Sequence, residues 1–328
     1  MKSLILSACV LLFFQGVTGC AKGLPQDRGF GPETYEVTMD IQANGFNRTY
    51  QIRIPSGGHA ENPLPLAVVI HGAFDTGLGM EKFSGFSKLA DRENFIVLYP
   101  DGMGLFGYLQ HWNAGHCCGK AAKDKVDDVG FIAAAIDDAC RRLNVDRTRI
   151  YILGFSNGGM MAYRFAAERA DMLAGAAFLA ASLGGKASEE EPDWRIPNPQ
   201  KSLPVLIMHG LEDQDVPYNG GISPRRGGQR TYWSVPDCVD FWVDHNGCKG
   251  SPNENRFREG RVIVKSWDDC ADGAAVSVWL IEGWGHDWPG IHFTGSLPDD
   301  EPLKDFDAAE ILWDFFENHT ATHASSNP

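Results

Sequence analysis

The period of the hydrophobic positions changes once along the chain. Residues 35–41 and 48–54 alternate apolar with polar side chains on either side of Asn44-Gly45, which predicts an antiparallel hairpin. The later hydrophobic runs are continuous, and parallel strands covered on both faces have this pattern. The runs predicted as such strands are residues 66–70, 95–99, 149–153, 174–181, 205–208 and 276–281.

Segments with helical spacing separate these strands. They are residues 129–143, 158–170, 236–245 and 306–318. Asp127 and Asp128 precede the first of them, and either can cap its start. Strands that alternate with helices predict an α/β protein with a mostly parallel central sheet, an antiparallel N-terminal hairpin and helices on both faces. This is the order of elements in the α/β-hydrolase fold.

Three stretches interrupt the alternation of strands and helices. Residues 183–202, 219–230 and 249–262 are rich in Gly, Pro, Asn or charged residues. We expect them to form loops over the carboxyl edge of the sheet, where binding sites form in open α/β folds. Nothing indicates a second domain, so we expect one domain over residues 35–320 and a tail over 321–328.

The N-terminus has the pattern of an export signal. A lysine precedes an apolar run over residues 4–14 that is too short to span a bilayer as a mature helix. The run leads to Val-Thr-Gly-Cys20, which resembles the lipobox of bacterial lipoproteins. We expect a signal peptide over residues 1–19, lipidation of Cys20 and a tether over 20–34. Cleavage near Ala21 and simple secretion is the alternative, and both interpretations export the protein.

Composition limits the partners. The formal net charge is −14 and the sequence pI is about 5.1, which argues against a nucleic-acid partner because phosphate binding needs a basic face. We expect a neutral or apolar substrate, and contact with a membrane only through the lipid anchor. Six cysteines remain beyond Cys20, and an exported protein favours disulfides, although spacing does not decide their pairing.

Ser156 lies where a predicted strand meets a predicted helix, in Gly154-Phe-Ser156-Asn-Gly158. A serine hydroxyl is a poor nucleophile unless it is exposed, aimed and paired with a base. A sharp turn between strand and helix exposes the hydroxyl, and the flanking glycines let neighbouring backbone approach it closely. The five-residue pattern is common by chance, but in this context it predicts the nucleophile elbow of a serine hydrolase.

An elbow of this kind predicts an acid and then a histidine further along the chain. Asp213 and Asp215 follow the predicted strand 205–208, and either can orient an imidazole, with Glu212 as a weaker candidate. His286 follows the last predicted strand in a loop flanked by glycine, and it is the expected general base.

Acyl transfer also needs donors for the oxyanion. The first expected donor is the backbone N–H of Asn157, directly after the nucleophile. The second is expected from the loop after residues 66–70, where we choose Ala73 over Phe74. His71 precedes the elbow in the chain, so we expect it to be structural.

Two further groups of residues have competing interpretations. Adjacent cysteines wrap a zinc ion poorly and are more often oxidised in an exported protein, so metal binding is disfavoured and we expect no metal and no cofactor. The potential ligands in question are His111, His116, Cys117 and Cys118. Aromatic side chains can line an acyl pocket but are more often buried; the candidates are Phe74, Trp112, Trp284 and Trp288.

Taken together, these motifs resemble a known family: the exported esterases related to polyhydroxybutyrate depolymerases and to feruloyl and acetylxylan esterases. The resemblance covers about residues 35–289 and rests on several motifs in one order. They are the elbow, His71-Gly72, Tyr99-Pro100-Asp101-Gly102, Trp112-Asn113-Ala114-Gly115, Cys117-Cys118-Gly119, residues 126–131, His209-Gly210, Val216-Pro217-Tyr218, Gly285-His286 and Trp288-Pro289-Gly290.

The resemblance implies further assignments. It favours Asp213 over Asp215 as the acid, and it implies a disulfide between Cys248 and Cys270. It also makes the Trp112-Asn113 loop a wall near the active site and gives Asp127-Asp128 a structural role. Two departures from the family pattern are the sequence after His71-Gly72 and the pair Cys140 and Cys238, which is a candidate for an extra bridge.

The resulting hypothesis is an exported serine esterase that acts on feruloyl or acetyl esters of plant cell-wall polysaccharide. The alternative substrate is a hydroxyalkanoate polyester or its oligomers. A peptidase on the same triad is less favoured, because we expect no gating domain in a chain of this length. A non-catalytic surface lipoprotein is less favoured because serine, acid and histidine are all present.

Overall fold

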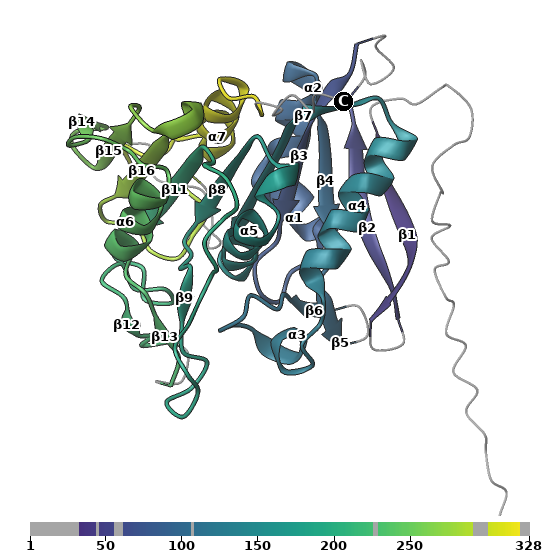
Figure 1. Ribbon diagram of the computed structural model, residues 1–328, viewed down its shortest axis with the longest axis horizontal. Coiled ribbons are helices and arrows are strands. Elements are labelled where there is room, and N and C mark those ends of the chain that lie inside the picture. Colours follow the sequence, from purple (N-terminus) through teal and green to yellow (C-terminus); the bar gives the residue numbers. More distant parts are fainter. Residues whose placement is uncertain are drawn as a thin grey trace, which may run out of the picture.

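The computed structural model describes residues 33–43, 46–55, 62–105, 108–225, 229–290 and 301–321. The signal segment, Cys20, the Asn44-Gly45 turn, and most of the tether and tail lie outside these residues. Ten strands form one sheet in the order β1-β2-β4-β3-β7-β8-β11-β16-β15-β14 (Figure 1). None of the helices in the described part of the chain has the length and apolar character needed to cross a membrane.

Six parallel strands make the centre of the sheet, as the continuous apolar runs predict. Every residue of β3 is buried, and its side chains alternate between two cores, with Leu66 and Val68 in one and Ala67 and Val69 in the other. A strand covered on both faces needs apolar residues at every position. The six are β4 (Ile96–Pro100), β3 (Leu64–Ile70), β7 (Val145–Phe155), β8 (Gly175–Leu179), β11 (Val205–Gly210) and β16 (Val276–Ile281).

An antiparallel hairpin borders the parallel strands at each edge. The predicted one pairs β1 (Glu33–Ala43) with β2 (Phe46–Ile54). At the other edge, β14 (Asn253–Phe257) pairs with β15 (Val262–Trp267). The expectation of a loop over 249–262 is therefore wrong. All five residues of β14 are exposed, so the strand has no apolar alternation and depends on its pairing with β15.

Three helices cover each face of the sheet. One core contains side chains of α4 (Asp128–Arg142), α5 (Asn157–Glu168) and α6 (Val235–His245), the helices in front of the sheet in Figure 1. The other core contains side chains of α1 (Gly77–Ser84), α2 (Phe86–Glu93) and α7 (Ala308–Glu317). The sequence predicted α4, α5, α6 and α7 but not the two short helices after β3.

Short elements gather where the parallel strands end, along the lower edge of Figure 1. They replace parts of the predicted loops 183–202 and 219–230 with small two-stranded ladders. The elements are β5 (Met103–Leu105), β6 (Tyr108–His111), α3 (Gly119–Lys123), β9 (Gly184–Gly185), β10 (Trp194–Arg195), β12 (Gly221–Ile222) and β13 (Thr231–Tyr232).

A buried ion pair ties the N-terminal hairpin to α4. Arg48 Nη2 of β2 lies 2.8 Å from Asp128 Oδ1, and the two side chains are 2% and 0% exposed. The second oxygen of Asp128 accepts the backbone N–H of Asn113 at 2.7 Å. Asp127 caps the helix instead, accepting the N–H of Gly130 at 2.8 Å. The two aspartates thus divide the roles of cap and buried anion.

Of the six cysteines that the structure describes, four are paired and two are free. Cys248 is bonded to Cys270, as the family resemblance implies, and Cys117 is bonded to Cys118. Cys140 and Cys238 are free thiols, so the candidate extra bridge between them is wrong. Cys140 lies on α4 and Cys238 on α6, and these helices cover different ends of one face of the sheet in Figure 1.

We expect Asp128→Asn to destabilise the fold strongly. Removing one member of a buried ion pair leaves the Arg48 guanidinium without a countercharge, which costs about 3–5 kcal/mol of unfolding free energy. Urea denaturation measures this loss. Asp137→Asn on the same helix is the control, since it breaks an exposed pair with Arg147 that water screens. Equal losses for the two variants would contradict the role of the buried pair.

Candidate active site

Ser156 occupies the sharp turn between β7 and α5. Its backbone has φ 56° and ψ −122°, a left-handed conformation that residues with a side chain rarely adopt. A Cβ on Gly154 would collide with the carbonyl oxygen of Gly158, and one on Gly158 would collide with those of Ile70 and His71. The two flanking glycines are therefore required by close backbone contacts, as the elbow interpretation predicts.

The structure brings Ser156, His286 and Asp213 together from three distant parts of the chain. Ser156 Oγ lies 2.8 Å from His286 Nε2, and His286 Nδ1 lies 2.7 Å from Asp213 Oδ2. A carboxylate can only accept, so the Nδ1–H donates to Asp213 and leaves Nε2 as the acceptor for the serine hydroxyl. This arrangement activates a serine for attack on a carbonyl carbon.

Asp213 is held as an anion in a buried site. Its Oδ1 accepts the backbone N–H groups of Asp215 and Val216, each at 2.8 Å. Burial by itself raises the pKa of the carboxyl, but the hydrogen bond and charge of His286, the nearby His209 and the Val216 N–H together hold the pKa below its ordinary value. The carboxylate is therefore ionised at neutral pH and can orient the imidazole.

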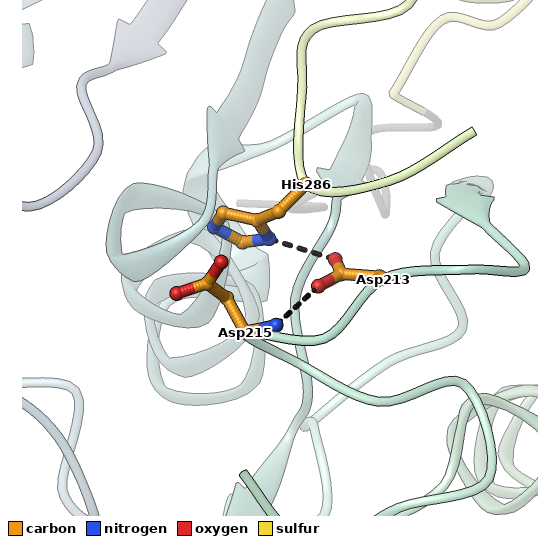
Figure 2. A group of neighbouring side chains, drawn as sticks. All are labelled: Asp213, Asp215 and His286. Atoms are coloured by element: carbon orange, nitrogen blue, oxygen red, sulfur yellow. Dashed lines mark hydrogen bonds and ion pairs between the residues drawn. The ribbon is translucent and has the colours of Figure 1, made fainter. Parts of the chain in front are cut away.

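The Asp215 side chain is not the one that bonds to His286. Figure 2 shows that Asp213, and not Asp215, makes the hydrogen bond to His286, while Asp215 contributes its backbone N–H to the Asp213 carboxylate. The Asp215 side chain lies 3.6 Å from Arg225. A carboxylate oxygen of Asp215 nevertheless lies within 4.8 Å of a carboxylate oxygen of Asp213 and of a ring nitrogen of His286. Glu212, the weaker candidate, contributes its backbone N–H to the Trp284 carbonyl.

The loop after β3 carries a fixed peptide between Gly72 and Ala73. The Nδ1–H of His71 donates to the Gly72 carbonyl at 2.7 Å, and His71 Nε2 accepts the N–H of Gly102 at 3.0 Å. The C=O and N–H of a trans peptide point in opposite directions, so drawing the Gly72 carbonyl toward His71 turns the Ala73 N–H away from it. Ala73 lines the cavities at Ser156.

The Phe74 amide is committed elsewhere, because it donates to the Gln110 carbonyl at 2.8 Å. This leaves Ala73, with Asn157, as the candidate oxyanion donors. Asn157 is the first residue of α5, whose N–H has no intrahelical partner. Burial lowers the pKa of His71 to about 4, so His71 is neutral at physiological pH and serves as a structural residue, as the sequence indicates.

Two cavities meet at Ser156. One of 490 Å³ contains His286 and an apolar wall from α1. The other, of 380 Å³, extends toward β13. Phe74 lines both and is 56% exposed, in agreement with its candidacy as a pocket residue. Side chains that the sequence did not single out include Met80, Phe83 and Phe155 in the first cavity, and Met160, Val216, Arg230 and Tyr232 in the second.

The three candidate tryptophans line neither of these cavities and pack inside the protein. Trp112 is fully buried and donates its Nε1–H to the His71 carbonyl at 3.0 Å. Trp284 donates to the Asp287 carbonyl at 3.0 Å. Trp288 packs against Phe83 with ring centroids 6.0 Å apart. Each tryptophan contacts a residue in or next to the site: His71, Asp287 or Phe83. The sequence does not distinguish such a buried position from one in the pocket wall.

The two histidines and two cysteines weighed as zinc ligands are engaged in other contacts. Both cysteines are in a disulfide, His111 packs edge-on against Phe74 with centroids 4.6 Å apart, and His116 stacks on Trp194 at 5.6 Å. Within the described ranges, the side chains that could share an ion are Asp213, Asp215 and His286. The first and last of these already bond to each other as described above.

The chain is similar in sequence to several known proteins. Residues 82–183 match the model of the prolyl oligopeptidase family. Feruloyl esterase B of Piromyces equi is 32% identical over 237 residues, which are 72% of this chain and 42% of that protein. The putative esterase NocK of Nocardia uniformis subsp. tsuyamanensis is 29% identical over 82% of this chain and 78% of its own length. This chain thus spans less than half the length of the Piromyces protein.

A solved structure supports the fold. The acetyl xylan esterase from Aspergillus awamori superposes with a TM-score of 0.56 at 18% identity, over 79% of this chain and 96% of that one. The sheet order and the elbow between β7 and α5 define this chain as an α/β-hydrolase. Within that class, the two sequence relatives are named as esterases, and they resemble this chain over 72% and 82% of its length.

We expect Asp213→Asn and Asp215→Asn to differ sharply. Loss of the Asp213 carboxylate leaves the His286 tautomer unfixed, so the rate at which a fluorophosphonate probe labels Ser156 should fall about a thousandfold or more. Asp215→Asn keeps its backbone N–H and should change the rate less than about tenfold. Rapid-quench labelling gives both rates. A larger loss for Asp215→Asn would assign the acid to Asp215.

Stability should also depend on the ionisation of Asp213. Because its pKa is lowered on folding, the contribution of the carboxylate is fully present above the unfolded pKa of about 3.9 and is lost as the pH falls through the folded value. The difference in unfolding free energy between wild type and Asp213→Asn should therefore shrink below about pH 4. Urea denaturation at a series of pH values tests this, and a constant difference would contradict it.

Proposed function

We propose that this protein is a serine esterase that hydrolyses carboxylic esters with Ser156 as nucleophile, His286 as general base and Asp213 as the orienting acid. The observation that carries the proposal is the continuous chain of hydrogen bonds from Ser156 Oγ through His286 to Asp213. The chemistry needs no cofactor, because the serine and the imidazole together supply the nucleophile and the proton transfers.

The reaction proceeds in two steps. Ser156 Oγ attacks the ester carbonyl carbon as its proton passes to His286 Nε2, and the N–H groups of Asn157 and Ala73 bind the oxyanion. His286 then protonates the departing alcohol, leaving an acyl-serine. Water attacks the acyl-serine with His286 again as base, which releases the acid and restores the serine.

The preferred substrates are feruloyl or acetyl esters of plant cell-wall polysaccharide. The names of the relatives support this choice, since they include a feruloyl esterase and an acetyl xylan esterase. The second candidate is a hydroxyalkanoate polyester or its oligomers. It is favoured by the apolar side chains of Met80, Phe83 and Phe155 in the cavity that contains His286, which suit an apolar alcohol better than a sugar.

Export is part of the proposal. It rests on the apolar run before Cys20 and on the lipobox-like residues around that cysteine. The mature enzyme is then tethered to the cell envelope through the lipid on Cys20, or it is secreted. In either location it meets extracellular esters, and the two disulfides suit an oxidising compartment.

We expect Ser156→Ala to abolish turnover of a short-chain chromogenic ester. Removing the nucleophile of a triad lowers kcat by about a millionfold, while the circular dichroism spectrum and the unfolding transition remain because the change deletes one oxygen atom. Arg256→Gln on the exposed strand β14 is a matched control that should keep full activity. Full activity in Ser156→Ala would overturn the proposal.

Wild type and Ser156→Ala together serve to identify the substrate. Wild type is assayed on methyl ferulate, acetylated xylan and short hydroxybutyrate oligomers, with Ser156→Ala as the blank for each. A higher kcat/KM on the first two supports the cell-wall assignment. A higher kcat/KM on the oligomers replaces it with the polyester assignment and leaves the triad untouched.

A further inference from the structure

The 380 Å³ cavity at Ser156 adjoins a larger one. It shares four lining residues with a cavity of 710 Å³: Cys117, Cys118, Gly119 and Arg230. The larger cavity is lined by residues of α3, by Val126 and Asp127 at the start of α4, and by Trp194 of β10. The two cavities are therefore neighbours that meet at Arg230, and their combined volume exceeds what an acetyl group fills.

Basic side chains predominate in the larger cavity, although the chain as a whole has a net charge of −14. Four basic residues and two acidic ones line it: Lys123, Lys125, Arg164, Arg230, Asp127 and Glu191. Of these, Arg164 is paired with Glu168 at 2.7 Å and Asp127 caps α4. The capping carboxylate keeps its charge, so with Arg164 paired the three other basic residues and the two acidic ones leave one net positive charge, which favours an anionic group in the cavity.

Arg230 lies where the two cavities join, and its donors are largely unused. Its Nη1 lies 3.5 Å from Cys118 Sγ, and a disulfide sulfur is a weak acceptor. Its Nε is buried without a hydrogen-bond partner in the described part of the chain. A planar guanidinium with free donors matches a carboxylate in geometry and charge.

His116 provides a second, independent indication of a ligand. The side chain lines the larger cavity and is 2% exposed, and neither ring nitrogen has a hydrogen bond of ordinary geometry within the described residues. Burial, and then the charge of Arg230, lower the pKa of His116 to about 3, although a contact with the Ala114 backbone opposes the shift. The neutral ring offers one donor and one acceptor, and buried polar groups of this kind normally have a partner.

The position of His286 decides which half of the ester meets Arg230. His286 must protonate the departing alcohol, so the alcohol lies on the side of the cavity that contains His286. The cavity without His286, which contains Arg230, then receives the acyl half. The far end of a long acyl group placed there reaches the Arg230 guanidinium and the larger cavity beyond it.

We propose that the two joined cavities form a subsite for an acyl group with a carboxylate at its far end, bound by Arg230 with His116 as a second polar partner. The substrate class is then the monoester of a dicarboxylic acid. The inference rests on the proposed function, because it takes Ser156 as the nucleophile of an esterase. Arg230 contacts the substrate in this assignment but takes no part in proton transfer.

The test compares paired substrates. One series consists of 4-methylumbelliferyl monoesters of dicarboxylic acids from succinate to suberate, and the other of the corresponding methyl-capped neutral diesters. For one chain length, wild type should prefer the anionic ester, and Arg230→Gln should lower the ratio of kcat/KM values, anionic over neutral, by about tenfold or more. Arg230→Lys should keep part of the preference. Arg256→Gln, which removes the same charge from the far edge of the sheet, should keep all of it.

Several outcomes overturn the inference. They are the absence of a preference in wild type, a ratio unchanged in Arg230→Gln, or an equal fall in Arg256→Gln. If wild type hydrolyses the neutral esters but shows no preference for the anionic ones, the proposed function stays intact. If it hydrolyses neither series, the proposed esterase function itself is refuted. Calorimetric titration of the free dicarboxylic acids into Ser156→Ala, with and without Arg230→Gln, then tests the subsite without turnover. Binding about tenfold weaker in the double variant supports it, and equal binding overturns it.

Discussion

The backbone at Ser156 has a conformation that a residue with a side chain adopts only when its surroundings impose it. The surroundings here are backbone atoms, since the glycines on either side contact the chain of β3 and α5 more closely than any side chain would permit. Asn157 extends this constraint. Its side chain accepts the N–H of Trp112 at 2.8 Å and donates to the Trp112 carbonyl at 3.2 Å. The elbow and the loop that begins at Trp112 are thus fixed to each other.

The connection between the elbow and the Trp112 loop explains why the buried polar groups near the site have a structural role. The loop at Trp112 is joined through Asn113 to Asp128, and through Asp128 to Arg48 on the N-terminal hairpin. Trp112 in turn donates to the His71 carbonyl, next to the peptide that carries the candidate oxyanion donor Ala73. The nucleophile and the proposed oxyanion donors are therefore held by one network of buried polar contacts, which has few alternative arrangements.

The sequence predicted those parts of the molecule that depend on local pattern and on order along the chain. Continuous apolar runs predicted the parallel strands. The context of Ser156 predicted His286 and a later acid, Asp213 or Asp215, and the family resemblance favoured Asp213. The sequence did not predict β14, because an exposed edge strand has no buried face to produce alternation. It also failed to separate Phe74, which lines both cavities, from Trp112, which is buried, because burial depends on segments far apart in the chain.

Composition is limited in a related way. A net charge of −14 argues for a neutral or apolar substrate when charge is taken as uniform over the surface. The basic residues Lys123, Lys125 and Arg230 nevertheless line a single cavity beside the nucleophile. An average over the whole chain contains no information about such a local excess, which depends on how α3 and the segment before β13 meet in space.

Apart from Ala73, Phe74 and Ser156, which line both, the two cavities at Ser156 are lined by different parts of the chain. The one that contains His286 takes its apolar wall from α1, which follows β3, whereas the other takes its walls from the residues around α3 and β13. Both sets of residues lie in connections after parallel strands, outside the sheet itself. Substitutions in one connection can therefore alter the recognition of the alcohol without altering that of the acid, and the reverse. A fold organised in this way can change its substrates one half at a time while the hydrolytic centre stays the same.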